Sequence, residues 1–205
     1  MKRIDINPNQ LNFIGAWNLE NNNLCNEIID FFEKNKNLQK KGGTSDASNN
    51  KKVKSTTDIT IRPIDLKDKN FDVFNKYMKE LHNCYVDYQK QWPFLKSMLN
   101  DIQIPPFNIQ KYNPGDHFST VHSERTSLNT LHRLFAFMTY LNDVEDGGKT
   151  NFDYYGIKVK PEIGKTLIWP AEWTHAHTGE VLKSGTKYIV TGWLHFPVKE
   201  TKEHE

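Results

Sequence analysis

The stretch from Phe107 to Glu124, FNIQKYNPGDHFSTVHSE, contains the pattern that decides the fold. Its first six residues are a short β-rich run, and the Asn-Pro-Gly-Asp sequence at residues 113–116 is a turn signal. Further β-rich runs follow at residues 134–141, 164–169 and 187–196, and Asp-Gly-Gly at residues 146–148 is another turn signal. Short strands separated by turns predict an antiparallel β sandwich or barrel over about residues 106–197.

The sequence before this β core indicates two helices and two short strands. The strands are expected at residues 13–19 and 58–63, and the first helix follows Asn-rich capping residues. Its apolar stripe is Leu24, Ile28, Phe31 and Phe32. The second helix should end before Pro93 and has a longer apolar stripe, which we interpret as core rather than as a ligand-binding wall: Phe74, Tyr77, Met78, Leu81, Tyr85 and Tyr88.

Residues 34–58 are rich in Lys, Asn, Gly, Ser and Thr, a composition that cannot bury an apolar face. They predict a long mobile loop. A loop of this length in a compact domain is usually a linker or a functional lid, and we favour a lid over about residues 36–57 because so little sequence precedes it. The Lys-Lys-Val-Lys sequence at residues 51–54 would then meet an anionic or peptide substrate. A solvated, disordered loop is the alternative interpretation.

The composition predicts a single domain over residues 1–205, with a helical and lid region at about 1–105 before the β core. The 27 Lys and Arg residues against 25 Asp and Glu residues give a formal charge of +2, so charge favours neither a nucleic acid nor a membrane as partner. The chain has two cysteines, Cys25 and Cys84, and neither a signal-peptide pattern nor a long apolar run. A reduced, cytoplasmic location is therefore expected.

The pair His122 and Glu124 is the first sign of a functional site. On a strand, a spacing of two places both side chains on one face. The pair alone is a weak signal, but one more histidine would complete a two-histidine, one-carboxylate face, the site type of non-haem Fe(II) oxygenases. The downstream candidates are His175, His177 and His195. Strand alternation does not choose between the first two, because both would face the same way.

Several blocks along the β core occur in the order and spacing of a known family. They are Tyr112-Asn-Pro-Gly115, His122-Ser-Glu124, Arg133, Tyr140-Leu-Asn-Asp143, Gly147-Gly-Lys-Thr-Asn-Phe152, Val159-Lys-Pro161, Gly164, His177-Thr-Gly179, Gly185-Thr-Lys187 and Trp193. Together they resemble the Fe(II)- and 2-oxoglutarate-dependent oxygenases of prolyl 4-hydroxylase type. The resemblance implies an α+β, mainly β fold: a double-stranded β-helix, or jelly roll, with N-terminal helices packed on its major sheet.

The same resemblance implies which residues form the site. In this family the distal histidine lies ten residues before a basic residue that holds the far carboxylate of 2-oxoglutarate, and His177 and Lys187 have that spacing. The metal ligands would be His122, Glu124 and His177. A buried lysine requires such an anion, because an unpaired buried ammonium is costly. Tyr140 would hydrogen-bond the same carboxylate and Tyr112 would line the co-substrate pocket, although both are equally well explained as core tyrosines.

The implied activity is hydroxylation of an unactivated carbon, with release of succinate and CO2. It would use Fe(II), 2-oxoglutarate and dioxygen, with ascorbate as a supporting reductant. We expect a peptidyl proline or a similar protein residue as substrate; the alternatives are a free amino acid or small metabolite, or a non-catalytic jelly-roll module that binds metal. Animal and plant prolyl hydroxylases have Asp at the position of Glu124, so the chain is more similar to short bacterial and phage members, and the cytoplasm of a bacterium or an infected host is the expected location. A carboxylate at this position also argues against a halogenase.

Overall fold

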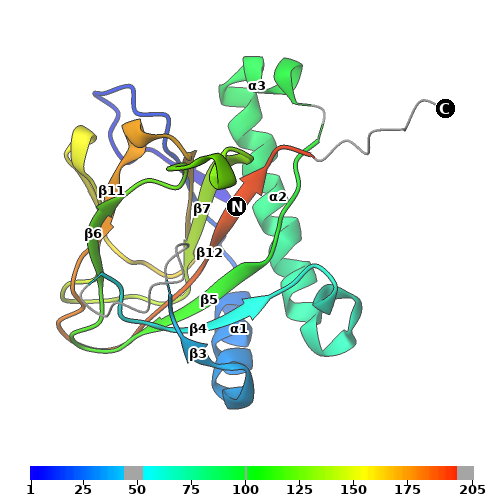
Figure 1. Ribbon diagram of the computed structural model, residues 1–205, viewed down its shortest axis with the longest axis vertical. Helices are drawn as coiled ribbons and strands as arrows, with labels where there is room; N and C mark the ends of the chain where they lie inside the picture. The colour runs from blue at the N-terminus through cyan, green and yellow to red at the C-terminus, as the bar shows by residue number, and fades with distance from the viewer. Residues whose placement is uncertain (44–52, 100, 198–205) are drawn as a thin grey trace.

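The computed structural model describes residues 1–43, 53–99 and 101–197, which form two antiparallel sheets and a layer of helices (Figure 1). The larger sheet has eight strands in the order β1-β2-β10-β7-β12-β5-β4-β3 and the smaller has four in the order β6-β11-β8-β9. The strands of the larger sheet are β1 (Lys2–Ile4), β2 (Gly15–Asn18), β3 (Lys40–Lys41), β4 (Thr57–Ile61), β5 (Phe107–Tyr112), β7 (Arg133–Tyr140), β10 (Lys165–Pro170) and β12 (Lys187–His195). Those of the smaller sheet are β6 (Phe118–His122), β8 (Thr150–Phe152), β9 (Ile157–Val159) and β11 (His177–Gly179).

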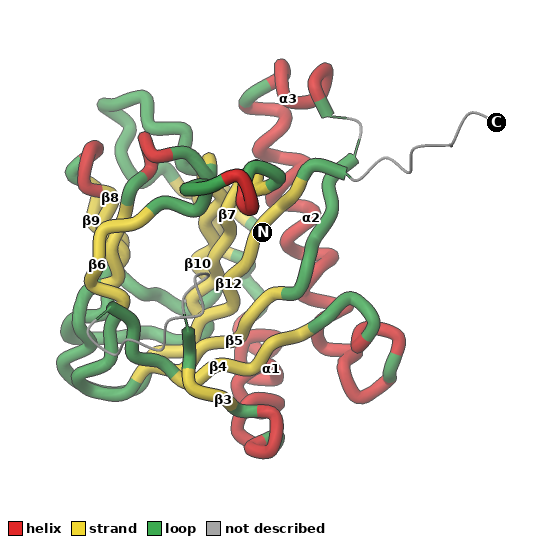
Figure 2. The backbone as a smooth tube through the Cα atoms, in the orientation of Figure 1, coloured by secondary structure: helices red, strands yellow, loops and turns green. Residues whose placement is uncertain are grey.

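The helices α1 (Asn22–Lys34), α2 (Asp72–Gln91) and α3 (Pro93–Met98) lie on one side of the larger sheet, and the smaller sheet lies on the other (Figure 2). Helix α1 begins where the side chain of Asn21 accepts a hydrogen bond from the Leu24 amide, at 3.2 Å, because a side-chain acceptor satisfies one of the free amides of the first turn. Both long helices pack through the apolar stripes that the sequence predicts, and this packing leaves the opposite face of the sheet free to form a site.

Strand β12 separates the two sides of the larger sheet, because successive side chains of a strand point to opposite faces. Val190 and Leu194 belong to the core cluster that also contains the buried residues of α1 and α2. Ile189 and Trp193 belong to, or pack against, a second cluster between the two sheets. One strand therefore supplies both the hydrophobic contact with the helices and one wall of the space between the sheets.

The structure confirms the main predicted elements of the chain, with shifts of a few residues at their ends. Both helices are present, the strand predicted at 107–112 has those bounds, and the strands predicted at 134–141, 164–169 and 187–196 correspond to β7, β10 and β12. The strands predicted at residues 13–19 and 58–63 correspond to β2 and β4. Together with β1 and β3, which the sequence does not predict, they come from the first 105 residues and join the larger sheet.

The predicted loop at residues 34–58 has ordered ends. A 3-10 helix (Lys36–Leu38) and strand β3 follow α1, and Ser55 forms a bridge with His117. Residues 44–52, including Lys51 and Lys52, lie outside the described residues. Lys54 is buried and forms an ion pair with Asp58, with 2.9 Å between Nζ and Oδ2, because a buried ammonium needs an anionic partner.

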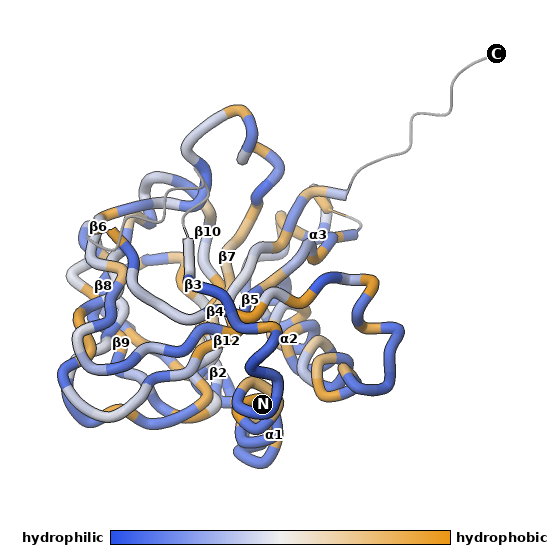
Figure 3. Tube along the Cα trace, turned by 60° about the horizontal axis from the view of Figure 1, so that its bottom comes forward, coloured by the Kyte–Doolittle hydropathy of each residue, from blue (hydrophilic) through white to orange (hydrophobic). Residues whose placement is uncertain are grey.

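Hydrophobic and hydrophilic residues are mixed along each helix (Figure 3). Within residues 1–43, 53–99 and 101–197, none of the helices has the length and apolar character needed to cross a bilayer.

Candidate metal centre

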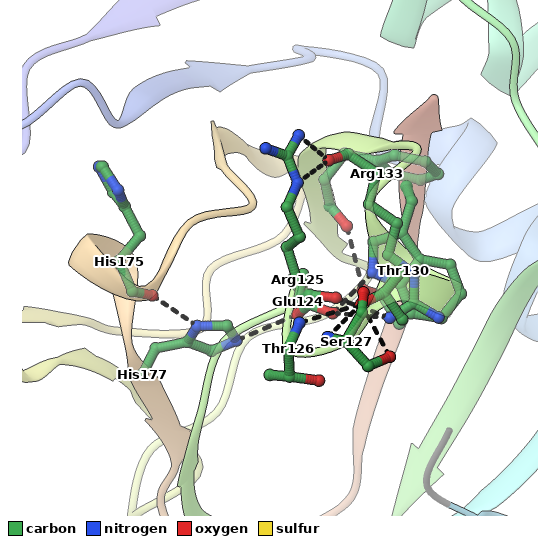
Figure 4. A network of polar contacts seen from close by, with 11 residues as sticks. Glu124, Arg125, Thr126, Ser127, Thr130, Arg133, His175 and His177 are labelled. Carbon is green, nitrogen blue, oxygen red and sulfur yellow. Dashed lines mark hydrogen bonds and ion pairs between the residues drawn. The ribbon is translucent and has the colours of Figure 1, made fainter. Parts of the chain in front are cut away.

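The two sheets bring His122 and His177 together. His122 is the last residue of β6 and His177 is the first residue of β11, and the antiparallel register of these strands places them directly opposite each other. Their ring centroids are 4.3 Å apart. Glu124 joins them, and one ligand atom from each of the three side chains lies within 4.8 Å of the others. Figure 4 shows His177 directed toward Glu124.

Both histidines are oriented by a backbone carbonyl. His122 Nδ1 is 2.8 Å from the Thr120 oxygen and His177 Nδ1 is 2.9 Å from the His175 oxygen. Since a carbonyl only accepts, Nδ1 carries a proton in each ring, and Nε2 is the nitrogen left for a metal. This is the arrangement that fixes the tautomer and ring plane of a metal-binding histidine. Phe118 stacks on the ring of His122, with 3.7 Å between ring centroids.

Glu124 lies beyond the end of β6, so it does not share a strand face with His122 as the spacing predicts. Its position comes from other contacts. Trp193 Nε1 donates a hydrogen bond to Oε2 at 2.6 Å, and Arg133 Nη1 donates one to the Glu124 backbone oxygen at 2.9 Å. The Arg133 guanidinium lies over the Trp193 ring, 3.7 Å from its centroid. The other oxygen, Oε1, is 3.4 Å from His177 Nε2 and is the one directed to the histidines.

The charge states of these side chains suit a cation. Burial alone would raise the pKa of Glu124, but its contacts with His177, the nearby His122 and the Trp193 hydrogen bond lower that pKa to about 2. Burial, together with the neighbouring His177, lowers the pKa of His122 to about 4. At neutral pH the site therefore presents a carboxylate and at least one neutral imidazole, the forms in which these side chains bind metals.

A cavity of about 320 Å³ opens beside these three residues, between the two sheets. Lys187 lies in its wall. The side chain is buried, with 2 % of the residue exposed, and burial lowers its pKa to about 7. Nζ donates to the Gly148 oxygen at 2.9 Å and lies 4.0 Å from the centroid of the Tyr112 ring. Among the described residues no carboxylate forms an ion pair with Lys187.

The two tyrosines predicted near the co-substrate have different surroundings. Tyr112 lines the cavity, but its hydroxyl donates to Gln110 at 2.9 Å, so its ring face rather than its hydroxyl meets Lys187. Tyr140 is buried and its hydroxyl donates to Thr150 Oγ1 at 2.6 Å. Thr150 lines the cavity, whereas Tyr140 is not among the lining residues.

The remaining histidine candidates are separate from this cluster. His175 belongs to a 3-10 helix (Trp173–His175), so the strand alternation that would place it beside His177 does not apply. Its ring points away from the ring of His177 (Figure 4), and His175 Nε2 lies 2.8 Å from the Asn12 oxygen. His195 ends β12 and its ring packs against that of His132, with 4.3 Å between centroids.

Sequence reasoning missed several residues that support the site. Beyond placing Trp193, Arg133 and Thr150 in the family blocks, the sequence assigns them no role at the metal. The signal for Trp193 was available, because residues 187, 189, 191 and 193 share one face of a strand, and all four line the cavity. Phe118, which stacks on His122, and Thr120, whose carbonyl oxygen bonds its ring, have no sequence feature that predicts these contacts beyond lying in the same strand.

The donor set fits an iron ion and a dicarboxylate. Two imidazoles and one carboxylate converge on one point, which is the facial triad associated with non-haem Fe(II). In the same cavity the buried Lys187 lacks an anionic partner within the part of the chain that the structure describes. Burying an unpaired ammonium is unfavourable, and an anionic ligand bound beside it would offset that cost. The arrangement can hold a divalent cation and a carboxylate-bearing organic molecule side by side.

Known proteins share both the sequence pattern and the fold. Residues 107–195 match the sequence model of the family described as the 2OG-Fe(II) oxygenase superfamily. The chain is 28 % identical over 114 residues to a probable prolyl 4-hydroxylase 9 of Arabidopsis thaliana, covering 43 % of this chain and 40 % of the relative. It is 27 % identical over 92 residues to the prolyl 4-hydroxylase subunit alpha-2 of Gallus gallus, covering 42 % of this chain and 17 % of the relative. The chain thus matches less than half the length of these curated relatives.

Solved structures agree in fold over nearly the whole chain. A prolyl-4-hydroxylase of Pseudomonas putida superposes with a TM-score of 0.69 at 15 % identity, covering 91 % of this chain and 94 % of that one. The viral collagen prolyl hydroxylase of Paramecium Bursaria Chlorella virus-1, solved with 2OG, gives 0.63 at 17 % identity, covering 91 % and 97 %. A Trichoplax adhaerens prolyl hydroxylase in complex with a hypoxia inducible factor peptide fragment gives 0.69 at 12 % identity, covering 90 % and 84 %. The predicted mainly β jelly roll is confirmed.

Proposed function

We propose, because residues 107–195 match the sequence model of the 2OG-Fe(II) oxygenase superfamily, that this chain hydroxylates an unactivated carbon of a peptide, with proline as the residue attacked. The observation that carries the proposal is the two-histidine, one-glutamate cluster beside a buried lysine in one cavity. Fe(II), 2-oxoglutarate and dioxygen are the cofactors of this family. The single domain over residues 1–205 and the cytoplasmic location stay predictions.

Each side chain of the site has a proposed role. His122, Glu124 and His177 would hold Fe(II), and Lys187 would bind the far carboxylate of 2-oxoglutarate. Bound together, Fe(II) and 2-oxoglutarate would supply the activation of dioxygen needed to hydroxylate carbon, with release of succinate and CO2. The chain itself orients the ligands through Thr120, His175, Trp193 and Arg133, while the buried rings of Phe152 and Trp169 beside His177 exclude water from that side of the site.

The names of the similar proteins favour a peptide substrate. The similar chains are named prolyl hydroxylases, and the Trichoplax adhaerens enzyme was solved with a peptide fragment. Hydroxylation of a free amino acid or small metabolite by the same residues is the alternative within the enzyme class. A metal-binding module without catalysis is the alternative of another class.

A succinate-release assay tests the proposal. Purified protein with Fe(II), 2-oxoglutarate and ascorbate is incubated with proline-containing peptides, with free amino acids, or with neither. We expect succinate above the uncoupled background only with peptides, and a +16 Da shift that fragmentation assigns to proline. A shift on a free amino acid would support the metabolite alternative. Binding of metal and 2-oxoglutarate without succinate under any condition would support the binding module.

Trp193→Phe is expected to weaken Fe(II) binding by about tenfold, because Glu124 loses the hydrogen bond that holds Oε2 and outer-shell partners of ligands typically have effects of this size. Isothermal titration with Fe(II) under anaerobic conditions measures the change. Tyr188→Phe is the matched control, since it removes a hydroxyl that bonds Glu33 from the other face of the same strand. Equal losses in both variants would contradict the role of Trp193.

The affinity for 2-oxoglutarate is expected to fall as pH rises above about 7. The pKa of Lys187 is lowered to about 7 in the free protein, and a bound carboxylate would raise it, so binding above pH 7 requires uptake of a proton. The Kd should be constant below pH 7 and increase by up to about tenfold per pH unit above it. Calorimetry at saturating Co(II) measures this dependence. Lys187→Arg should show a flat profile, because a guanidinium stays charged.

A further inference from the structure

Resting on the proposed metal site, we propose that His175 is a positioning residue: its side chain fastens the Trp173–His175 turn to the N-terminal segment, so that its own carbonyl holds the ring of His177. His175, which the sequence leaves as a candidate metal ligand, would then act on the metal site by orienting the ligand His177. The segment before β2, which contains Asn12, would thereby take part in positioning the metal site.

The ring of His175 is fully engaged and unable to reach a metal. The residue is 3 % exposed. Nε2 lies 2.8 Å from the backbone oxygen of Asn12, which only accepts, so Nε2 carries the proton. Nδ1 lies 3.0 Å from Thr174 Oγ1 and therefore accepts from that hydroxyl. With both nitrogens committed, the side chain works as a link between two segments that are 163 residues apart.

The backbone of the same residue touches the distal ligand. The His175 oxygen accepts from His177 Nδ1 at 2.9 Å, and this bond sets the direction of the ring that faces Glu124. The turn has further contacts: its own amides close it through the Glu172 and Trp173 oxygens, the Asp153 amide donates to the Ala176 oxygen at 3.2 Å, and Arg125 forms an ion pair with Glu172. These contacts connect the turn to residues that follow β6 and β8, and the His175 side chain adds the connection to the N-terminal segment.

The other end of the link is held by hydrogen bonds. Asn12 is buried, its Oδ1 accepts from the Ile14 amide at 2.9 Å and its Nδ2 donates to the Gln10 oxygen at 3.0 Å. Strand β2 begins at Gly15 and pairs with β10 in the larger sheet. The carbonyl that receives His175 is thus tied to the larger sheet, whereas His177 belongs to the smaller one. The link fixes the distal ligand of one sheet against the framework of the other.

A core histidine with no role at the metal site would be buried in the same way. The effect of substitutions at position 175 on metal binding separates that interpretation from a positioning role. Any residue at position 175 offers a carbonyl to His177. Only a side chain with a donor at the place of Nε2 keeps the bond to Asn12. Gln can place its amide nitrogen close to that point, whereas Ala leaves the Asn12 oxygen buried and unpaired.

Anaerobic titration with Co(II) alone, followed by its visible absorption, tests the proposal without turnover. We expect His175→Ala to weaken Co(II) binding by about tenfold and to alter the absorption bands, while one ion still binds per chain. His175→Gln should recover most of the affinity and the bands. Trp17→Phe is the control for general damage to the N-terminal segment: it removes a 2.8 Å hydrogen bond to Asp87 and should lower the melting temperature without changing Co(II) binding.

Asn12→Ala tests the link from its other end and serves if His175→Ala does not fold. Introduced alone, Asn12→Ala should weaken Co(II) binding. Introduced together with His175→Ala, it should weaken binding little further, because both substitutions disrupt the same connection. Co(II) affinity of His175→Ala within twofold of wild type, or His175→Gln as weak as His175→Ala, would overturn the positioning role. The proposed function fails separately, if wild type binds no Co(II) or if His177→Ala binds it equally well.

Discussion

His177→Ala is expected to abolish Fe(II) binding, weakening it by roughly 100-fold or more, since loss of a ligand exceeds the 10- to 100-fold effects of outer-shell changes. The physical reason is that His177 Nε2 is one of three converging donors, and alanine leaves Glu124 with only His122 as a partner ligand. Anaerobic calorimetry with Fe(II) measures the loss, and succinate release should disappear with it.

His175→Ala is the matched comparison, because it removes an imidazole two residues away that is engaged with Asn12. It should still bind one Fe(II) per chain, with an affinity reduced by only about tenfold. The reverse order, with His175→Ala inactive in binding and His177→Ala nearly normal, would contradict the ligand assignment.

Lys187→Ala is expected to raise the 2-oxoglutarate concentration needed for half-maximal succinate release by about 100-fold, because truncating one side of a buried charge pair costs about 2–5 kcal/mol. Fe(II) binding should remain close to wild type, since Lys187 is not among the three converging donors. The measurements are succinate release against 2-oxoglutarate concentration and calorimetry of 2-oxoglutarate with Co(II) bound.

Lys187→Met is the control for volume, since its unbranched side chain fills a similar space without the charge. It should lose 2-oxoglutarate affinity as Lys187→Ala does, but the melting temperature of the ligand-free protein should stay equal or rise, because a buried ammonium without an anion destabilises the fold. An unchanged 2-oxoglutarate requirement in both variants would exclude the proposed role of Lys187.

The sequence predicted the parts of the fold that depend on local periodicity. The stripes of α1 and α2 and the alternation along β12 are local patterns, so the helices, the main strands and the inward face that carries Lys187 could all be expected. The convergence of His122, Glu124 and His177 was implied by family resemblance, and the register between β6 and β11 brings these residues together.

The remaining details depend on contacts between distant segments. His175 was expected to share a strand face with His177, but the chain forms a 3-10 turn there and the ring bonds Asn12. Glu124 lies past the end of its strand, held by Trp193 from a strand that comes 69 residues later. The Tyr140 hydroxyl turns to Thr150. In each case a hydrogen-bond partner from another element determines the direction of a side chain, and spacing along the chain carries no such information.

The alternation of β12 also bears on how this protein can diversify. Lys187, Ile189, Thr191 and Trp193 line the cavity, whereas Val190 and Leu194 pack with the helical core. Substitutions at Ile189 and Thr191 therefore act on the space between the two sheets and leave the contact between the larger sheet and the helices in place. Changes that reshape the cavity and changes that weaken the helical contact thus fall at different positions of one short segment, which makes the cavity-facing residues a target for a randomised library.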